Sequence, residues 1–565
     1  MKVLGCLAGC LLLSLLASGS AHAGEPRLEH RWLFIMRDLS QAENLTAALD
    51  LLPRAQAAGY NAIVLSDSGL YRLDTAPDSY KAALLEFQRE AEQHGMELVP
   101  AVMPIGYSGS ILGRDPNLAE GLPVKDAPFI ARDGTAVLAP DPQASLPGGD
   151  FESVDGDRFA GWDWHDYPGQ STFADHRVVH SGQTSVRMEN IDEADPVHGH
   201  CRFMRAVKVS PCRQYHLSAW VKTEDFERTS SAHMSVLAPT EKERSIGSRT
   251  LSMGRTQDWT QYHLVFNSLD WDEVRVYIGT WGGKGGKIWW DDVKLQEIGL
   301  MNVLRRPGCP VSVRSEDGAV YQEGRDFKPI HDPRLRPWET YHEPPIISLT
   351  PDSPIADGER LRVSYYHPLV IHQWQVMCCL SEPKLYDILR DQVEQVNDLL
   401  HPSTFFMQHD EIRVANWDKI CQDRGLTPGQ LLADNVRRCA QIIRDINPDA
   451  RVWVWSDMFD PMHNARDDYY LVNGTLAGSW EGLTPDIGIV NWANHLKGKN
   501  LQWFAERGHE QILAGYYDHE EWIIDEWLNA GEGLPGIGGA MYTTWENDYS
   551  DLQEWASLAW GTQRQ

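Results

Sequence analysis

The sequence predicts an α/β protein, a (β/α)8 barrel of the TIM type with an inserted antiparallel β-sandwich (jelly-roll) domain. Near both ends of the chain, short apolar runs alternate with amphipathic segments, as in parallel strands joined by helices. Between Gly148 and Leu300 the pattern changes to short alternating strands without helices, which is typical of an antiparallel sandwich. The 565 residues also exceed what one hydrophobic core usually holds, so more than one domain is expected.

The first three barrel strands are expected before residue 140. Apolar runs occupy Trp32–Met36, Asn61–Leu65 and Glu97–Val102, and the stretch Ser79–His94 between the last two has helical spacing. This succession of strands and helices is typical of the start of a parallel barrel or of a doubly wound sheet.

The other five strands are expected after the interruption. Helix Glu382–Leu400 leads to strand Thr404–Gln408, and helix Thr427–Ile446 leads to strand Arg451–Trp455. Three further short apolar strands lie at Asp486–Trp492, Gln511–Tyr517 and Gly538–Thr544. Three strands before the interruption and five after it complete a barrel of eight, whose active site is expected where the strands end.

The interrupting region divides into two parts. Tyr215–Val221 and Val274–Ile278 are typical strands of the sandwich, while Met301–Pro368 contains strands and hairpins that belong clearly to neither domain. The expected domains are a signal peptide at 1–23, a catalytic barrel at 24–140 and 369–565, a sandwich at 145–300 and a β-rich connecting segment at 301–368.

The N-terminus has the pattern of a secretory signal. Lys2 precedes an apolar run over Val3–Leu16, and Ala21-His22-Ala23 is a small-residue cleavage sequence. Cys10 resembles a lipobox cysteine, but the main apolar run follows it, which favours a secreted or periplasmic protein over a lipid-anchored one. No later segment has the roughly 20 uninterrupted apolar residues of a membrane span.

The amino-acid composition limits the classes of binding partner that we expect. With 51 basic and 80 acidic residues the net charge is −29, so nucleic acid is an unsuitable partner. The 22 tryptophans are typical of proteins that stack aromatic rings on sugars, although most tryptophans pack in cores. Seven of the nine cysteines follow the leader; Cys201 and Cys212 are candidates for a disulfide, and the cysteine spacings match no zinc motif.

Carboxylates and aromatic residues follow most of the barrel strands. The candidates are Arg37 after strand one, His409, Asp410 and Glu411 after strand four, Trp455 and Asp457 after strand five, Trp492 after strand six, Tyr517 and Asp518 after strand seven, and Trp545 and Glu546 after strand eight. Such a rim suits a ring-shaped, polyhydroxylated substrate. The Asp410–Glu411 pair stands out because it directly follows an apolar strand, as catalytic residues of barrels do.

These residues resemble glycoside hydrolase family 20, the β-N-acetylhexosaminidases. The resemblance rests on the Asp410–Glu411 pair, Trp453–Asp457, Tyr517–Asp518 and Trp545–Glu546, and it covers roughly 30–140 and 370–560. Two features depart from that family. Gln408-His409 replaces the Gly-rich lead into the acid pair, and the rim after strand three, Met103-Pro104-Ile105-Gly106, lacks the family's acidic residue.

The resemblance implies a retaining mechanism in which the substrate's own 2-acetamido oxygen attacks the anomeric carbon. Glu411 would be the general acid and then the base, with a pKa raised toward neutrality, and Asp410 would accept the acetamido N–H. Tyr517 would donate to the acetamido oxygen. The remaining candidates would bind substrate. Trp455, Trp492 and Trp545 would form the walls of the sugar site, and Arg37 and Glu546 would bind the outer hydroxyl groups of the sugar. His409 would be an orienting hydrogen-bond partner, and Asp457 and Asp518 would either bind the sugar or form ion pairs at the rim. No catalytic cofactor or active-site metal is implied.

The inserted domain resembles a jelly-roll carbohydrate-binding module of the family 4/9 type. The matching segments are Gly149–Glu152, Leu217–Lys222 and Ile288–Val293. The resemblance implies a structural Ca²⁺ near Glu152 and Asp292, although Asp291 and Asp292 could equally form a turn. It also leaves open whether the module binds glycan or only braces the barrel.

Two other functions remain open. One is a retaining β-glycosidase with Glu411 as acid/base and Glu520 or Glu521 as a true nucleophile, about 5 to 5.5 Å away. The other is a secreted, non-catalytic glycan-binding protein. In all three cases the expected partner is an oligosaccharide, polysaccharide or glycoconjugate glycan.

Overall fold

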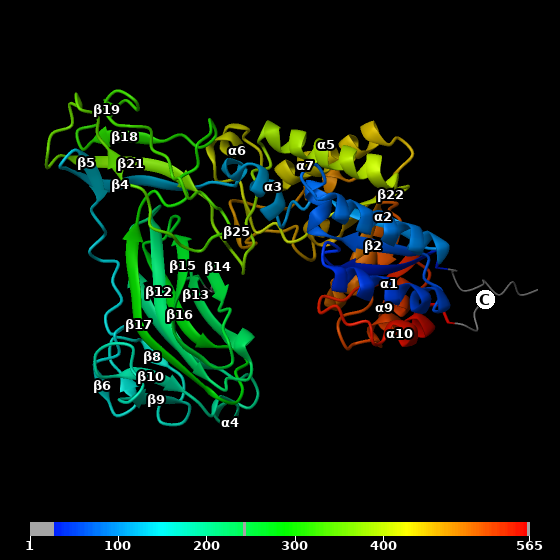
Figure 1. Ribbon diagram of the computed structural model, residues 1–565, viewed down its shortest axis with the longest axis horizontal. Coiled ribbons are helices and arrows are strands. Elements are labelled where there is room, and N and C mark those ends of the chain that lie inside the picture. The colour runs from blue at the N-terminus through cyan, green and yellow to red at the C-terminus, as the bar shows by residue number, and fades with distance from the viewer. Residues whose placement is uncertain (1–27, 241–243, 562–565) are drawn as a thin grey trace, which may run out of the picture.

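The computed structural model describes residues 28–240 and 244–561, so the expected signal peptide lies outside the described residues. Eight parallel strands close into a barrel in chain order (Figure 1). They are β1 (His30–Met36), β2 (Ala62–Ser66), β3 (Glu97–Val102), β22 (Thr404–Met407), β24 (Arg451–Trp455), β26 (Ile487–Asn491), β27 (Gln511–Leu513) and β28 (Ile537–Tyr542). Pairing of β28 with β1 closes the ring, which confirms the predicted eight-stranded parallel barrel.

Helices cover the outside of the barrel. They are α1 (Ala42–Ala57), α2 (Asp78–Gln93), α5 (Pro383–Leu400), α7 (Pro428–Ile446), α8 (Lys497–Ala505), α9 (Ile523–Gly531) and α10 (Leu552–Ala559). The connection from β24 to β26 differs from the expected alternation, because it contains no α-helix but two 3-10 turns, η4 (Asp457–Phe459) and η5 (Ser479–Gly482), and the short β25 (Leu471–Val472). Here η5 packs directly on α7: a Cβ at Gly482 would lie 2.2 Å from the carbonyl oxygen of Ala433.

Aromatic side chains fill the barrel interior. Trp32 and Trp453 lie edge to face with ring centroids 5.1 Å apart, and Phe406 meets Trp455 in the same way at 4.9 Å. All four are buried, together with Phe34 on β1. The barrel interior is therefore a packed core and not a pore.

The inserted sandwich consists of two five-stranded antiparallel sheets. The first has the order β15 (Gln257–Asn267), β12 (Gln214–Glu224), β17 (Lys287–Ile298), β10 (Ser185–Met188) and β9 (Thr172–Asp175). The second has the order β14 (Ser245–Thr250), β13 (Ala232–Leu237), β16 (Glu273–Thr280), β11 (Cys201–Lys208) and β8 (Trp164–His165). Alternate residues of β12, including Tyr215, Leu217 and Ala219, are fully buried between them, as the sequence predicted.

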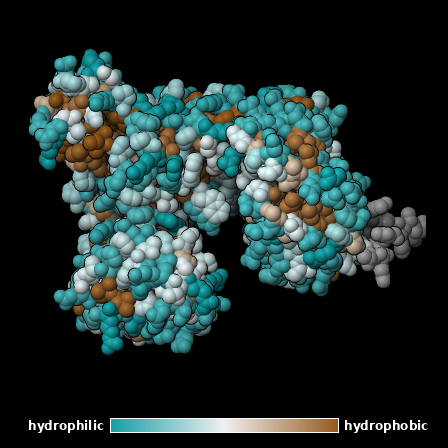
Figure 2. Space-filling view, viewed as in Figure 1, coloured by the Kyte–Doolittle hydropathy of each residue, from teal (hydrophilic) through white to brown (hydrophobic). Residues whose placement is uncertain are grey.

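A third antiparallel sheet joins the barrel segment to the connecting segment. Its order is β19 (Val320–Tyr321), β18 (Ser312–Ser315), β21 (Arg360–His367), β4 (Leu122–Arg132), β5 (Thr135–Leu138) and β20 (Ile347–Ser348). The sequence places residues 122–138 in the barrel, but in the structure they pair with residues 301–368. Phe129 of β4 packs with Leu361 and Val363 of β21 in a separate small core, so this region is a structural unit of its own. Hydrophobic side chains gather at the upper left of Figure 2, where Figure 1 places this sheet. Val137 of β5 and Val320 of β19 are exposed.

The cysteines of the described residues are free thiols, so the disulfide expected between Cys201 and Cys212 is wrong. The eight residues of β11, which starts at Cys201, extend over roughly 25 Å and carry the two thiols apart. The Cys201 thiol contacts the hydroxyl of Thr172 instead. Among the described residues, no helix is long and apolar enough to cross a membrane.

Truncation of Phe406 to alanine should destabilise the barrel by about 3–5 kcal/mol, because the side chain is fully buried and its loss leaves a cavity. Thermal and denaturant unfolding followed by tryptophan fluorescence measure the effect. Leu85→Ala on α2 is the control, since Leu85 is 41% exposed and should cost under about 1 kcal/mol. Equal losses in the two variants would contradict the packed interior.

Candidate functional site

The acid pair follows β22 and rests on the loop after β3. The N–H of Ile105 donates to the carbonyl of Gln408 at 2.9 Å, and Glu411 has a φ of 51°, in the left-handed region. A Cβ at Gly106 would lie 1.6 Å from the carbonyl oxygen of Asp410. Only glycine allows this approach, so the loop after β3, in which the sequence showed no acidic residue, supports the acid pair through Gly106.

Both carboxylate oxygens of Glu411 are engaged. The Tyr107 hydroxyl donates to Oε2, and Nη2 of Arg413 lies 2.6 Å from Oε1. The Glu411 side chain remains 25% exposed, so a ligand can still reach it. Neither Tyr107 nor Arg413 was a candidate from the sequence. Arg413, two residues beyond the pair, could have been noticed, whereas Tyr107 lies on a different loop and had no sequence signal.

Two further carboxyl groups, those of Asp410 and Asp457, lie beside Glu411. Oδ2 of Asp457 accepts hydrogen bonds from the Glu411 backbone N–H at 2.9 Å and from Nδ2 of Asn464 at 3.0 Å. Burial raises the pKa of Asp457 to about 7. Burial, followed by the negative charges of Asp457 and Glu411, raises the pKa of Asp410 to about 8. The two aspartates therefore titrate near neutral pH, an environment typical of functional carboxyls.

Gln375, which follows the connecting segment, contacts the loops around the acid pair. Nε2 of Gln375 donates to the carbonyls of Gly106 at 2.8 Å and of Glu411 at 2.9 Å, and its Oε1 accepts from Arg413. The neighbouring Trp374 is 65% exposed. Gln375, which the sequence did not connect with the site, thus holds the loop of the acid pair.

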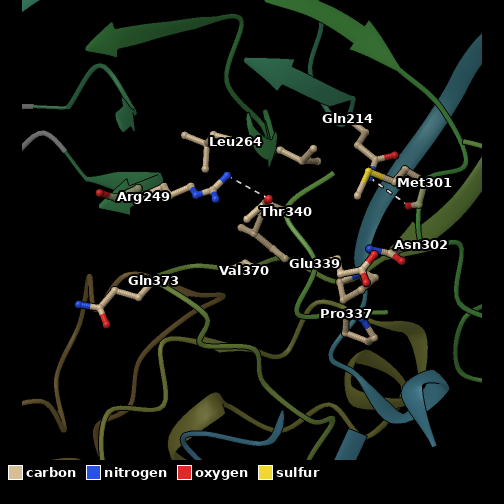
Figure 3. Close-up of a pocket in the computed structure, with 14 residues that line it drawn as sticks. Gln214, Arg249, Leu264, Met301, Asn302, Pro337, Glu339, Thr340, Val370 and Gln373 are labelled. Atoms are coloured by element: carbon tan, nitrogen blue, oxygen red, sulfur yellow. Dashed lines mark hydrogen bonds between the residues drawn. The ribbon is translucent and has the colours of Figure 1, made fainter. Parts of the chain in front are cut away.

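The sandwich and the connecting segment also touch this end of the molecule. Nη2 of Arg244 donates to the carbonyl of Val472 at 3.0 Å, and its Nε donates to that of Tyr470. The Arg413 guanidinium lies over the Tyr470 ring, 4.9 Å from its centroid. A small pocket, in which Arg249 of the sandwich donates to Thr340 of the connecting segment at 3.0 Å, is also lined by Val370 and Gln373 (Figure 3).

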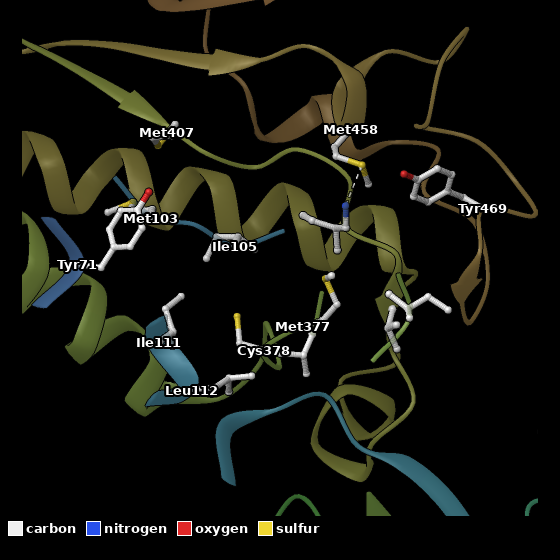
Figure 4. Packing of buried hydrophobic residues seen from close by; sticks show 14 of the residues in the cluster. Tyr71, Met103, Ile105, Ile111, Leu112, Met377, Cys378, Met407, Met458 and Tyr469 are labelled. Carbon is white, nitrogen blue, oxygen red and sulfur yellow. Dashed lines mark hydrogen bonds between the residues drawn. The ribbon is translucent and has the colours of Figure 1, made fainter. Parts of the chain in front are cut away.

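The floor below the acid pair is apolar and rich in methionine. Met103, Met407 and Met458 are fully buried, and the Ile412 N–H lies 3.3 Å from the Met458 sulfur (Figure 4). His409 is also buried, and its Nε2 is hydrogen-bonded to Oδ1 of Asn435. Burial lowers the pKa of His409 to about 4. His409 is therefore a neutral anchor of the loop, in line with the orienting role expected of it.

The aromatic candidates divide into core and rim. Trp455 is 2% exposed in the barrel interior, so it cannot form a wall of a sugar site. Trp545 is half-buried on Phe34, and Trp492 is half-buried against His463 with ring centroids 4.8 Å apart. The rings that are most open at the rim are those of Tyr517, Trp522 and Trp374, at 48%, 50% and 65% exposure.

The remaining rim candidates are mostly held by their neighbours. Asp518 accepts from the Trp545 backbone N–H at 3.1 Å and from the Thr544 hydroxyl, so it joins the ends of β27 and β28. Nη1 of Arg37 donates to Asn44 at 3.3 Å. Glu546 is 70% exposed and 4.0 Å from the His519 ring. Burial, with the charges of Asp518, Glu411 and Glu520, raises the pKa of Tyr517, which keeps its hydroxyl a donor.

The proposed nucleophiles of the alternative mechanism lie after β27. Glu520 is exposed and Glu521 is half-buried. Among the described residues, no side-chain hydrogen bond or ion pair orients either carboxylate. An unoriented carboxylate is poorly suited to in-line attack on an anomeric carbon.

The sandwich carboxylates do not fit the expected calcium ion. Oε1 of Glu152 accepts backbone N–H groups of Gln183 and Thr184 at 2.8 and 3.1 Å. Asp292 faces Nδ1 of His180 at 2.8 Å and the Lys294 ammonium at 3.3 Å. Cationic and N–H donors use the oxygens that a calcium ion would need.

No family model and no curated protein matches the chain. Solved structures that are similar to it include the CBM4 carbohydrate-binding module, with a TM-score of 0.21 and 17% identity over 27% of this chain and 99% of that one. The CBM22-1 xylan-binding domain of Paenibacillus barcinonensis Xyn10C has a TM-score of 0.21 and 12% identity, over 29% and 98%. An apo-form cyclase from Fischerella sp. has a TM-score of 0.21 and 11% identity, over 27% and 97%. Similarity at this level does not decide between sugar binding and other functions.

Gly106→Ala should displace the acid pair, because its Cβ would overlap the Asp410 carbonyl oxygen. We expect a destabilisation of about 1–3 kcal/mol or more, measured as a lower thermal midpoint. Gly109→Ala in α3 (Gly109–Arg114) is the matched control, since no heavy atom lies within 4 Å of its new Cβ. A Gly106 variant as stable as the Gly109 variant would show that the loops are not in tight contact.

Proposed function

We propose that this protein is secreted and binds glycans at the barrel mouth, and that it hydrolyses them there by substrate-assisted catalysis, as a β-N-acetylhexosaminidase-like glycosidase. The observation that carries the proposal is the arrangement of three carboxyl groups in which Asp457 holds the Glu411 backbone at 2.9 Å while Glu411 stays accessible. The half-exposed ring of Tyr517 lies near enough to Glu411 for that charge to raise the Tyr517 pKa, and an aromatic ring beside a carboxylate suits the apolar and polar faces of a sugar.

In this mechanism the chain supplies a proton, an acceptor and a donor. Glu411 protonates the leaving oxygen and then takes a proton from water. Asp410 in its ionised form accepts the acetamido N–H, and the Tyr517 hydroxyl donates to the acetamido oxygen that attacks the anomeric carbon. Because Tyr107 and Arg413 engage both Glu411 oxygens in the free protein, substrate must displace one of them before proton transfer.

A non-catalytic glycan-binding protein is the second candidate. The engagement of both Glu411 oxygens favours it, because the carboxylate is then a fixed part of an ion pair with Arg413. In that case the aromatic rim would bind the sugar and the carboxylates would only hold its hydroxyl groups.

Hydrolysis of aryl β-glycosides with and without a 2-acetamido group tests the proposal. We expect the acetamido sugars to be preferred, and Glu411→Gln and Asp410→Asn to lower kcat/KM by about 10²–10⁴-fold. Glu193→Gln in the exposed Asp192–Glu193 pair of the sandwich is the control and should be unchanged.

Two outcomes would contradict it. Glycan binding in calorimetry without turnover by the wild type would establish the non-catalytic function. Turnover of plain glucosides or galactosides that survives Asp410→Asn would point to Glu520 or Glu521, and single Gln variants at those positions would then identify the nucleophile.

The pH profile should depend on Asp457. Asp410 is protonated below its raised pKa of about 8, so kcat/KM should increase with pH between about 7 and 8 as the acceptor form appears. Asp457→Asn removes a neighbouring negative charge and keeps an oxygen for the Glu411 N–H, so the rise should move to lower pH. Profiles of both proteins measure this, and coincident profiles would show that Asp410 is not the titrating group.

A further inference from the structure

A second cluster of reactive side chains lies apart from the acid pair. Glu120, Cys379, Asp418 and Cys421 are all buried, and one potential ligand atom from each lies within 4.8 Å of all the others. The two sulfurs are 3.4 Å apart. The proposed reaction uses none of these groups.

The four donor groups lie close together, and part of their hydrogen-bonding capacity is already used by the surrounding chain. Oε1 of Glu120 accepts the backbone N–H groups of Trp417 and Asp418 at 2.6 and 3.3 Å, whereas its Oε2 faces only the Cys421 sulfur at 3.8 Å. Oδ1 of Asp418 caps α6 (Lys419–Asp423) through the Cys421 N–H at 3.1 Å.

The charge around the cluster is unbalanced. Arg306 is the cation there: it lies 2.7 Å from Asp418 and also pairs with Glu382. The Glu120 carboxyl is a further buried acid, and no ion pair among the described residues involves it. A buried excess of carboxylate is costly unless a cation or a proton offsets it.

We propose that Glu120, Cys379, Asp418 and Cys421 bind one thiophilic divalent cation of the zinc type. Two thiolates and two carboxylates form a tetrahedral donor set that suits zinc. Bond lengths of about 2.0–2.3 Å place tetrahedral ligand atoms about 3.3–3.8 Å apart, with two sulfurs at the long end of this range. The sulfur–sulfur separation of 3.4 Å and the sulfur–carboxylate separation of 3.8 Å each lie within about 0.4 Å of the value that zinc requires, so small side-chain shifts complete the site. On binding, each thiol releases a proton to solvent, and no electron is transferred.

With four protein ligands in a buried setting, the ion has a structural role. Cys379 follows Gln375 by four residues, and Asp418 follows Arg413 by five, so the ion joins the two segments that hold Glu411. The site is therefore expected to stabilise the loops of the barrel mouth.

The second group of potential ligands, Asp195, His198 and His200, is less suitable. The oxygens of Asp195 accept the backbone N–H groups of His198 and His200 at 3.1 and 3.2 Å, and the His198 side chain is 64% exposed. A single carboxylate that is already hydrogen-bonded offers a weaker site than the buried thiolates.

Elemental analysis of the full-length mature protein, purified without chelator and dialysed with zinc, tests the proposal. We expect about one equivalent of zinc per chain, lost in Cys421→Ser and Cys379→Ser and kept in Cys439→Ser, which removes another buried thiol. A double His198→Ala, His200→Ala variant should also keep the ion. Chelation should lower the thermal midpoint of the wild type and leave that of Cys421→Ser unchanged.

Glu120→Gln gives a second test that keeps the side-chain volume and both thiols, should a serine variant not fold. It should weaken zinc binding by at least about 10-fold, measured by competition with a chromophoric chelator. Three results would overturn the proposal: no zinc in the wild type, zinc retained in both cysteine variants, or a Cys379–Cys421 disulfide found by thiol alkylation and intact mass.

Discussion

The pairing of β22 between β3 and β24 is the interaction on which the candidate site depends. Met407 lies beside Val102 on one side and Val454 on the other, so the three strands end at the same level. The residues that follow them are then forced together, and the loop of Gly106, the acid pair and Asp457 meet within hydrogen-bonding distance. Barrel closure by β28 on β1 keeps these strands from separating.

The long excursion between β3 and β22 contributes to the site instead of merely interrupting the barrel. The third sheet returns the chain to the barrel mouth, where Gln375 bonds to the Glu411 carbonyl. The sandwich is tied to the same place through Arg244. The loops around the acid pair are therefore in contact with residues that lie outside the barrel.

The site stores unfavourable energy that the rest of the structure must offset. Met103 and Glu411 adopt left-handed backbone angles, and two aspartates share a region where burial disfavours their charged forms. Both raised pKa values mean that the folded state is favoured when these groups are protonated, so their contribution to stability falls as pH rises from about 4, the ordinary pKa of an aspartate, to about 7 to 8, and changes no further above that. Such concentrated strain is common at functional sites and suits a site that binds a polar ligand in place of water.

The sequence by itself determined the eight barrel strands, the sandwich and the position of Asp410–Glu411, because each depends on periodicity or on residues that directly follow a strand. Only the tertiary structure decided that Trp455 points into the barrel and that 122–138 pair with β21. It also decided that Tyr107, Arg413 and Gln375 surround Glu411, and that Glu120 meets Cys421 across 301 residues of sequence. These contacts are made by side chains far apart in the chain, so no local pattern records them, and they form only when barrel closure brings the strand ends together.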